Sequence, residues 1–235
     1  MNVARSVGAP SLLLRTLKNT LLPMGPRMRR LPLGIARGLA LEIDFRHHSK
    51  LYLGLYEVEL NRHLRRLCYR GARCFDVGGH IGYDALILAR LSGGDVFTFE
   101  ADERLCAVIQ RAVDANRHYG EKIKIVRAFV AESSDEATNQ VSLDAFVRPG
   151  DVGLPDLIKI DVEGAEALVL RGAEQILCER RPNLIIETHG SQVEEECLQL
   201  LHAHGYTPQT VDPRRLAADH RPEKHNRWLV CRGRA

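Results

Sequence analysis

Residues 74–82 read CFDVGGHIG, an apolar strand pattern that ends in an acid and passes through a glycine-rich turn into a helical pattern. Glycine at such a turn lets the backbone adopt angles that a Cβ forbids and approach a ligand closely. Open α/β sheets bind their ligands at the carboxyl ends of the strands, where this turn is expected to lie. The segment therefore predicts a ligand-binding α/β fold.

The chain around this segment alternates short β-rich runs with helical patterns, which is typical of a parallel sheet covered by helices. We predict seven strands, at residues 73–77, 96–100, 123–126, 156–161, 184–187, 206–211 and 228–231. Helical patterns occupy residues 51–67, 81–91, 105–116, 165–177 and 193–204. A chain of 235 residues with 45% apolar content suits one α/β domain with a short extension.

Positive charge is concentrated at the start of the chain, although the net charge is only +3. Residues 1–40 contain Lys and Arg but no acid, and their prolines and glycines predict an irregular arm. We therefore divide the chain into a basic irregular extension, residues 1–50, and a folded domain, residues 51–235. The arm is interpreted as a solvated tail, with a lid or a peripheral membrane contact as alternatives. The remaining body has no large cationic stripe, so no nucleic-acid partner is expected.

The cysteines and the apolar segments bear on compartment and metal content. Six cysteines are scattered without a C-x-x-C pair, so neither a zinc site nor a disulfide framework is predicted. The apolar stretch at residues 11–22 is interrupted by Arg15 and Lys18, which makes it too short and too charged for a transmembrane helix or a signal peptide. We predict a cytoplasmic protein with no transmembrane segment and no metal site.

The glycine spacing distinguishes between classes of ligand. A dinucleotide enzyme requires G-x-G-x-x-G, and counting from Gly78 finds no glycine at either later position. The chain instead has D-x-G-x-x-x-G from Asp76 to Gly82, whose acid repels phosphate and attracts a cationic group. Glu100 ends the next strand, where a carboxylate accepts hydrogen bonds from the hydroxyls of a ribose. The pattern favours a nucleoside that carries positive charge, and a purely structural turn is the alternative.

A second acidic run, DLIKIDVEGAE, occupies residues 156–166. Asp161 ends a buried strand pattern, so we expect it to face the same crevice as Asp76 and Glu100. Glu166 has a second interpretation, as a first-turn acid that the helix dipole favours.

The fifth predicted strand ends in Glu187, Thr188 and His189, which adds a carboxylate and an imidazole at the rim of the crevice. An unperturbed histidine has a pKa of about 6.5, so His189 is a candidate general base near neutral pH. A packing or capping histidine is the alternative interpretation.

Taken together, these motifs resemble the FkbM-type methyltransferases over about residues 51–232. The resemblance rests on GLYE (54–57), FDVGGHIGY (75–83), FE (99–100), SLD (142–144), DLIKIDVEGAE (156–166), LRGA (170–173), RPNLIIETH (181–189) and GY (205–206). It implies a Rossmann-like class I methyltransferase fold, a mostly parallel seven-stranded sheet with the last strand antiparallel and helices on both faces. It also implies S-adenosyl-L-methionine as cofactor and transfer of its methyl group, usually to an oxygen of a sugar or secondary metabolite.

The resemblance assigns roles by motif position. It implies that Asp76, Gly78 and Gly82 form the turn on the methionine side of the cofactor, and that Glu100 binds the ribose. It also implies that Glu132 lies beside the adenine and that Asp161 lies between cofactor and acceptor. Gly79 and His80, in the same turn, are further cofactor-binding candidates, although the family more often has Ala-Asn there. We predict an O-methyltransferase for a small-molecule or glycan acceptor, with His189, or failing that Asp161, as base. The alternatives are a cofactor-binding protein that performs no transfer and a nicotinamide oxidoreductase, which the glycine spacing disfavours.

Overall fold

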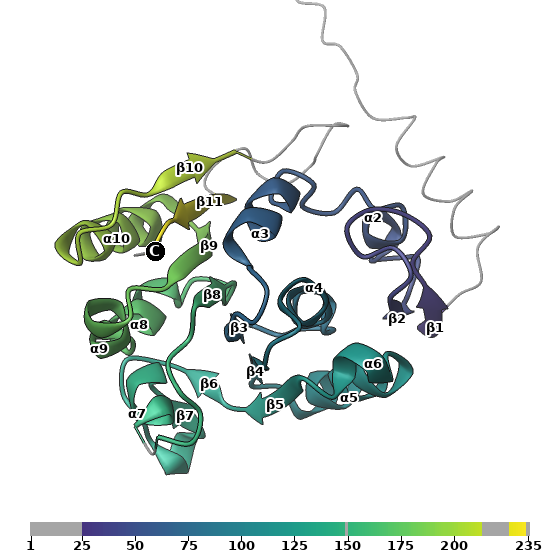
Figure 1. The fold of residues 1–235 in the computed structure, drawn as a ribbon, viewed down its shortest axis with the longest axis horizontal. Helices are drawn as coiled ribbons and strands as arrows, with labels where there is room; N and C mark the ends of the chain where they lie inside the picture. The colour runs from purple at the N-terminus through teal and green to yellow at the C-terminus, as the bar shows by residue number, and fades with distance from the viewer. Residues whose placement is uncertain (1–24, 149, 213–225, 234–235) are drawn as a thin grey trace, which may run out of the picture.

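The computed structural model describes residues 25–148, 150–212 and 226–233 of the chain. Its centre is a seven-stranded sheet in the order β10-β11-β9-β8-β3-β4-β5 (Figure 1). Five strands are parallel, namely β3 (Cys74–Val77), β4 (Val96–Glu100), β5 (Ile123–Arg127), β8 (Leu157–Ile160) and β9 (Asn183–His189). The last strand, β11 (Asn226–Cys231), inserts antiparallel between β9 and β10 (Gln209–Val211). The predicted mostly parallel seven-stranded sheet with an antiparallel last strand is therefore confirmed.

Helices cover both faces of the sheet because its central strands are apolar on both sides. Along β3, Cys74 packs into one core layer and Phe75 into the other, as the two-residue period of a strand requires. The first layer is covered by α3 (Asn61–Leu67), α4 (Tyr83–Ser92) and α5 (Glu103–Ala115), with the short α6 (Arg117–Gly120) beside α4. The second is covered by α7 (Leu143–Val147), α8 (Glu166–Arg171), α9 (Glu174–Glu179) and α10 (Ser191–Ala203).

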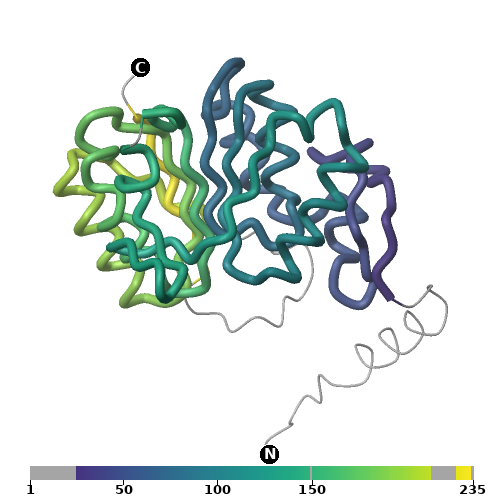
Figure 2. The backbone as a smooth tube through the Cα atoms, turned by 90° about the horizontal axis from the view of Figure 1, so that it is seen from below, coloured from purple at the N-terminus to yellow at the C-terminus, as the bar shows by residue number. Residues whose placement is uncertain are grey.

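The prediction of an irregular N-terminal arm is wrong for its second half. Strand β1 (Arg27–Arg30) pairs antiparallel with β2 (Ala40–Ile43), and Figures 1 and 2 place this hairpin at the β5 edge of the molecule, beside α5. Apolar side chains between and within the two strands, among them Leu31 and Leu41, are fully buried. Their burial outweighs the turn-forming composition that suggested a loop. Residues 1–24 of the predicted extension lie outside the described residues, and the boundary at residue 50 stays a prediction.

Two predicted helices are each divided in the structure. Residues 51–67 form α2 (Ser49–Tyr52) and α3, separated by a turn in which Gly54 and Glu57 have positive φ. Residues 165–177 form α8 and α9, which are separated at Gly172, where the backbone lies against Ala131. The pairing of β6 (Phe129–Val130) with β7 (Gln140–Val141) was not predicted, nor was the 3-10 turn η1 (Glu136–Thr138) that lies between these two strands.

None of the helices in the described part of the chain combines the length and the apolar content that crossing a membrane requires.

Candidate active site

A cavity of about 1060 Å³ opens at the carboxyl ends of β3, β4 and β8. Gly78, Glu100 and Asp161, which follow or end these three strands, all line it. One wall comes from residues 47–59 around α2, and another from residues 128–130 at β6. The predicted crevice is therefore present, and it contains acids from two strands that flank β3.

The glycine turn after β3 is required by contacts within the protein. Gly78 has a φ of +97°, and a Cβ built on it would overlap the carbonyl oxygen of Asp161. A Cβ on Gly79 would overlap the hydroxyl of Thr98 on β4. The sequence suggested that these glycines allow a ligand to approach. In the structure, the lack of a side chain at both positions instead allows the ends of the neighbouring strands to approach. Both residues still line the cavity with their backbone.

The carboxylate of Glu100 is held in place by two backbone amides. The N–H of His80 donates to Oε2 at 2.8 Å, and the N–H of Asp102 donates to Oε1 at 2.9 Å. His80 has a φ of +46°, which belongs to the left-handed region, and the side chain of Asp102 caps the N-terminus of α5. Each carboxylate oxygen retains acceptor capacity, so Glu100 can bind a pair of hydroxyl groups.

A buried lysine, Lys159 on β8, lies among carboxylates. The Nζ atom of Lys159 lies 2.8 Å from Asp84 Oδ2 and 3.2 Å from Asp161 Oδ2, and the lysine side chain is 2% exposed. Burial opposes its charge, but Asp84, Asp161 and Glu57 outweigh this effect and raise the pKa of Lys159 well above its usual value. One cation therefore faces several acids, which leaves the cavity favourable to a positively charged ligand.

Asp76 is fully buried and does not line the cavity. Thr98 donates a hydrogen bond to its Oδ2 at 2.9 Å, while Oδ1 has no hydrogen-bond partner among the described residues. Burial, and then the nearby carboxylate of Asp84, raise the pKa of Asp76 to about 7. The structure thus places this predicted binding residue beneath the turn. Gly82, the N-cap of α4, and the exposed Glu132 do not line the cavity either.

Glu57 was not predicted as a site residue, although the GLYE motif at residues 54–57 was recognised. It lines the cavity beside Tyr56, and its φ is +44°. Burial raises the pKa of Glu57 to about 8, although Lys159 acts in the opposite direction. Glu57 was missed because the sequence pattern placed it inside a continuous helix, in which its side chain was not expected to face the cavity.

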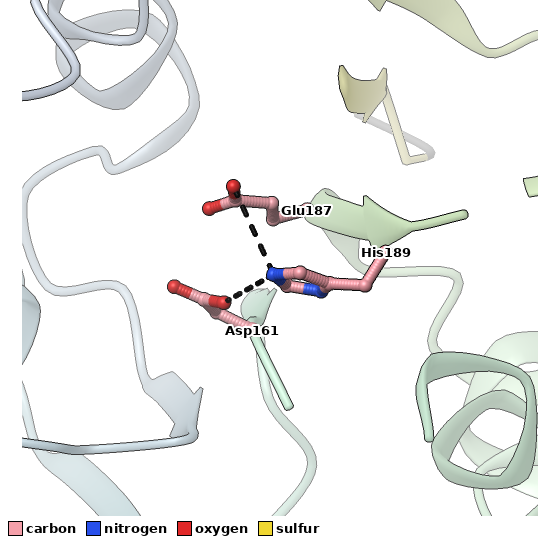
Figure 3. Close-up of side chains that lie close together, drawn as sticks. All are labelled: Asp161, Glu187 and His189. Carbon is pink, nitrogen blue, oxygen red and sulfur yellow. Dashed lines mark ion pairs between the residues drawn. The ribbon is translucent and has the colours of Figure 1, made fainter. Parts of the chain in front are cut away.

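His189, at the end of β9, does not line the cavity, and it lies among carboxylates. Its Nδ1 is 2.5 Å from Glu166 Oε1, and its Nε2 is 3.7 Å from Asp161 Oδ1 and 3.9 Å from Glu187 Oε1 (Figure 3). Burial lowers its pKa, but the contact with Glu166 and the charges of Glu187 and Asp161 raise the pKa of His189 to about 9. A histidine that is already protonated at neutral pH cannot accept a proton, so this environment does not favour His189 as the base.

The same cluster has the composition of a metal site. Asp161, Glu187 and His189 each offer one ligand atom, and these atoms lie within 4.8 Å of one another. The sequence predicted no metal site because the three residues come from two strands and show no ligand spacing.

Comparison with known families gives one match in this region. Residues 116–208 match the model of the methyltransferase FkbM domain. This part of the chain is similar to the FkbM methyltransferase domain. The match begins at the end of α5 and includes β8, β9 and α10, and so includes Asp161 and His189. A comparison with curated protein sequences gives no match.

Several solved structures share the fold of this chain. The methyltransferase FkbM of Methylobacillus flagellatus KT is 18% identical, with a TM-score of 0.56, and the alignment covers 68% of this chain and 43% of that one. The chain therefore spans less than half the length of that protein. An O-methyltransferase from Bacillus cereus in complex with S-adenosylhomocysteine is 14% identical, with a TM-score of 0.53 and coverage of 75% and 79%.

An rRNA methylase from Streptococcus thermophilus shares the fold as well, at 17% identity, a TM-score of 0.52 and coverage of 73% of this chain and 92% of that one. The similar structures thus include both an O-methyltransferase and an rRNA methylase. They do not separate a small-molecule acceptor from an RNA, so the expected absence of a nucleic-acid partner stays a prediction.

Proposed function

We propose that the chain transfers the methyl group of S-adenosyl-L-methionine to a hydroxyl oxygen of a small molecule or glycan. The observation that carries this proposal is the pair of acidic positions on either side of β3. Glu100 is held by two backbone amides on one side, and Asp161 belongs to the acids around Lys159 on the other. The pair matches a ligand that has a ribose diol at one point and a positive charge at another.

The residues that line the cavity fit this cofactor. Glu100 would accept hydrogen bonds from the ribose hydroxyls, and the carboxylate of Asp161 would attract the cationic groups. Leu105 and Phe129 offer apolar surface on the Glu100 side for the adenine. The volume of about 1060 Å³ is at the upper end of the range for ligand pockets, which leaves room for an acceptor beside the cofactor. When bound, S-adenosyl-L-methionine supplies a methyl group on a sulfonium.

We assign the base to Asp161 in preference to His189. Asp161 lines the cavity and its Oδ2 is held by Lys159, whereas His189 lies behind it. A carboxylate held at the cavity wall can accept the proton of an acceptor hydroxyl and keep its oxygen in line with the methyl group. The contact between Lys159 and Oδ2 restrains the carboxylate and leaves its Oδ1 atom available to other partners.

Calorimetric titration with S-adenosyl-L-methionine and with S-adenosylhomocysteine tests cofactor binding. We expect Glu100→Gln to weaken the binding of both compounds by at least tenfold, because an amide NH2 group replaces one of the two carboxylate oxygens that accept hydrogen bonds from the ribose hydroxyls. Glu103→Gln is the matched control, since Glu103 lies on α5 with an exposed side chain and pairs with Arg127 outside the cavity lining. Absence of binding to the wild-type chain, with its fold verified by circular dichroism, would refute the proposal.

Transfer is tested with cofactor that carries a radioactive methyl group and a panel of sugars, hydroxylated metabolites and RNA. Incorporation into a hydroxyl compound that Asp161→Asn abolishes, with cofactor affinity retained, would support the proposed base. Incorporation into RNA alone would show that the acceptor is RNA and would refute a small-molecule or glycan acceptor. Cofactor binding without incorporation into any of them would favour a binding protein that performs no transfer.

A further inference from the structure

Three side chains beside the cavity converge at a single point. Figure 3 shows the imidazole of His189 directed between the carboxylates of Asp161 and Glu187, which come from neighbouring strand ends. We propose that these three residues bind a divalent transition-metal cation, of the class of Mn²⁺ or Zn²⁺. The sites and roles assigned above do not require this ion.

The separations between the ligand atoms suit one shared ion. Metal–nitrogen and metal–oxygen bonds in such sites measure about 2.0–2.2 Å, so two ligands of one ion are at most about 4.4 Å apart. Nε2 of His189 lies 3.7 Å from Asp161 Oδ1 and 3.9 Å from Glu187 Oε1, too far for hydrogen bonds and within the reach of an ion between them. All three ligand atoms lie within 4.8 Å, so a modest side-chain rotation completes the site.

The other ring nitrogen of His189 supplies an independent observation. Metal-binding histidines commonly give their second ring nitrogen to a carboxylate, which orients the ring toward the ion. Glu166 has this position, with Oε1 2.5 Å from Nδ1, and its side chain is completely buried. The N–H of Gly164 donates to the same oxygen at 3.0 Å, which orients the Glu166 carboxylate in turn. Nε2 therefore faces Asp161 and Glu187, and binding an ion there displaces its proton.

The charge of the cluster also favours a cation. Glu187 and Glu166 are buried, and Asp161 is only 21% exposed, so several carboxylates share a region of low solvent access. Glu163 Oε2 lies 3.8 Å from the same ring nitrogen, but its side chain is 88% exposed and it is not part of the proposed set.

The ligand types indicate the class of ion. The imidazole suits Zn²⁺ and related ions better than it suits Mg²⁺ or Ca²⁺, which prefer oxygen ligands throughout, and the two carboxylates also suit Mn²⁺. Three protein ligands leave coordination positions open, and Asp161 also lines the cavity. If the proposed methyl transfer is correct, an ion here would bind the acceptor oxygen, fix its direction of approach and ease the loss of its proton, and Asp161 would then act as a ligand of the ion in place of accepting the proton itself.

Binding of Mn²⁺ to the full chain, after treatment with a chelator, tests the site. The free ion is measured by electron paramagnetic resonance, and Zn²⁺ and Mg²⁺ are used as competitors. We expect one Mn²⁺ per chain, displaced by Zn²⁺ at concentrations at least tenfold below those of Mg²⁺. We also expect nitrogen hyperfine coupling from an imidazole ligand, a signature that a purely structural histidine does not produce.

Variants assign the ligands. His189→Gln, Glu187→Gln and Asp161→Asn should each weaken Mn²⁺ binding at least tenfold, and Glu166→Gln should weaken it less. Glu196→Gln should leave binding unchanged, because Glu196 pairs with Arg171 on α8, away from the cluster. Circular dichroism and the Tm of each variant identify any that fail to fold, and the remaining ligand variants decide the result.

The proposal is overturned if the wild-type chain binds neither Mn²⁺ nor Zn²⁺, or if folded His189→Gln and Glu187→Gln bind Mn²⁺ as the wild type does. The measurement needs no cofactor or acceptor. Metal binding without affinity for S-adenosyl-L-methionine would therefore refute the proposed function and leave the proposed metal site standing. Affinity for S-adenosyl-L-methionine without metal binding would refute the metal site and leave the proposed function standing.

Discussion

The carbonyl oxygen of Asp161 occupies the space in which any residue other than glycine at position 78 would have its Cβ. The turn after β3 and the strand end of β8 are therefore in contact through backbone atoms, at the point where both line the cavity. This contact fixes the Asp161 side chain relative to the glycine turn. It joins the two sequence motifs that predicted the site into one structural unit.

Gly78→Ala should destabilise the protein by about 3 kcal/mol or more, because it adds a steric overlap to an unfavourable backbone conformation. Gly71→Ala is the matched control, since Gly71 has a φ of +84° and open space around its Cβ position. We expect that variant to lose about 1 kcal/mol. Urea unfolding monitored by circular dichroism gives both values, and equal losses would show that the overlap with Asp161 is relieved at little cost.

Lys159→Met should destabilise the protein by about 3–5 kcal/mol, since it leaves buried carboxylates without their cation. Asp84 lies closest to the lysine Nζ, so the double variant Lys159→Met with Asp84→Asn should recover part of this loss. A double-mutant cycle from urea unfolding measures the coupling. Coupling near zero would mean that Lys159 and Asp84 act independently, contrary to their 2.8 Å contact.

Glu57 should make stability depend on pH in a defined direction. Burial raises its folded-state pKa to about 8, with Lys159 opposing and Asp84, Glu187 and Asp161 adding to the shift. Below the unfolded value of about 4.5 both states are protonated, and as pH rises toward 8 the unfolded state alone loses its proton, so stability falls. Glu57→Gln should therefore raise the Tm increasingly between pH 5 and pH 8.

The comparison of Tm against pH for wild type and Glu57→Gln isolates this group from the other acids. A difference in Tm that is constant from pH 5 to pH 8 would show that Glu57 is not the residue that retains its proton. Glu59→Gln, on the same segment, is the control and should leave the pH profile of the wild type unchanged.

Asn116→Ala should destabilise the protein by about 2 kcal/mol through its contacts with β2. Its Oδ1 accepts from the Ala40 N–H at 2.9 Å, and its Nδ2 donates to the Ala40 carbonyl at 2.7 Å, both in buried surroundings. Removing the amide leaves a buried donor and acceptor on Ala40 without partners. Hydrogen exchange at Ala40 should accelerate together with the loss measured by urea unfolding.

Asp114→Ala, on the exposed side of the same helix, is the control for Asn116→Ala and should change stability by less than about 0.5 kcal/mol. Unchanged stability in Asn116→Ala, with rapid exchange at Ala40 already in the wild type, would indicate that the β1–β2 hairpin opens independently. The predicted division at residue 50 would then describe the folding units correctly.

The alternating apolar and helical patterns were sufficient to predict the sheet, because a strand buried on both faces must be apolar along its length. Seven predicted strands correspond to β3, β4, β5, β8, β9, β10 and β11. The acids Glu100 and Asp161 were predicted from the same logic, since parallel strands end at one edge of the sheet. The β1–β2 hairpin was missed because burial against α5 depends on a partner that local composition does not reveal.

By itself, the sequence determined the fold class and the edge of the sheet at which the cavity lies, because both follow from local periodicity and from strand ends. Only the tertiary structure decided which side chains share one environment. It buried Asp76 beneath the turn, brought Glu57 to the cavity wall, and surrounded His189 with carboxylates from separate elements. Protonation and metal affinity depend on distances between residues far apart in the chain, and no linear pattern encodes those distances.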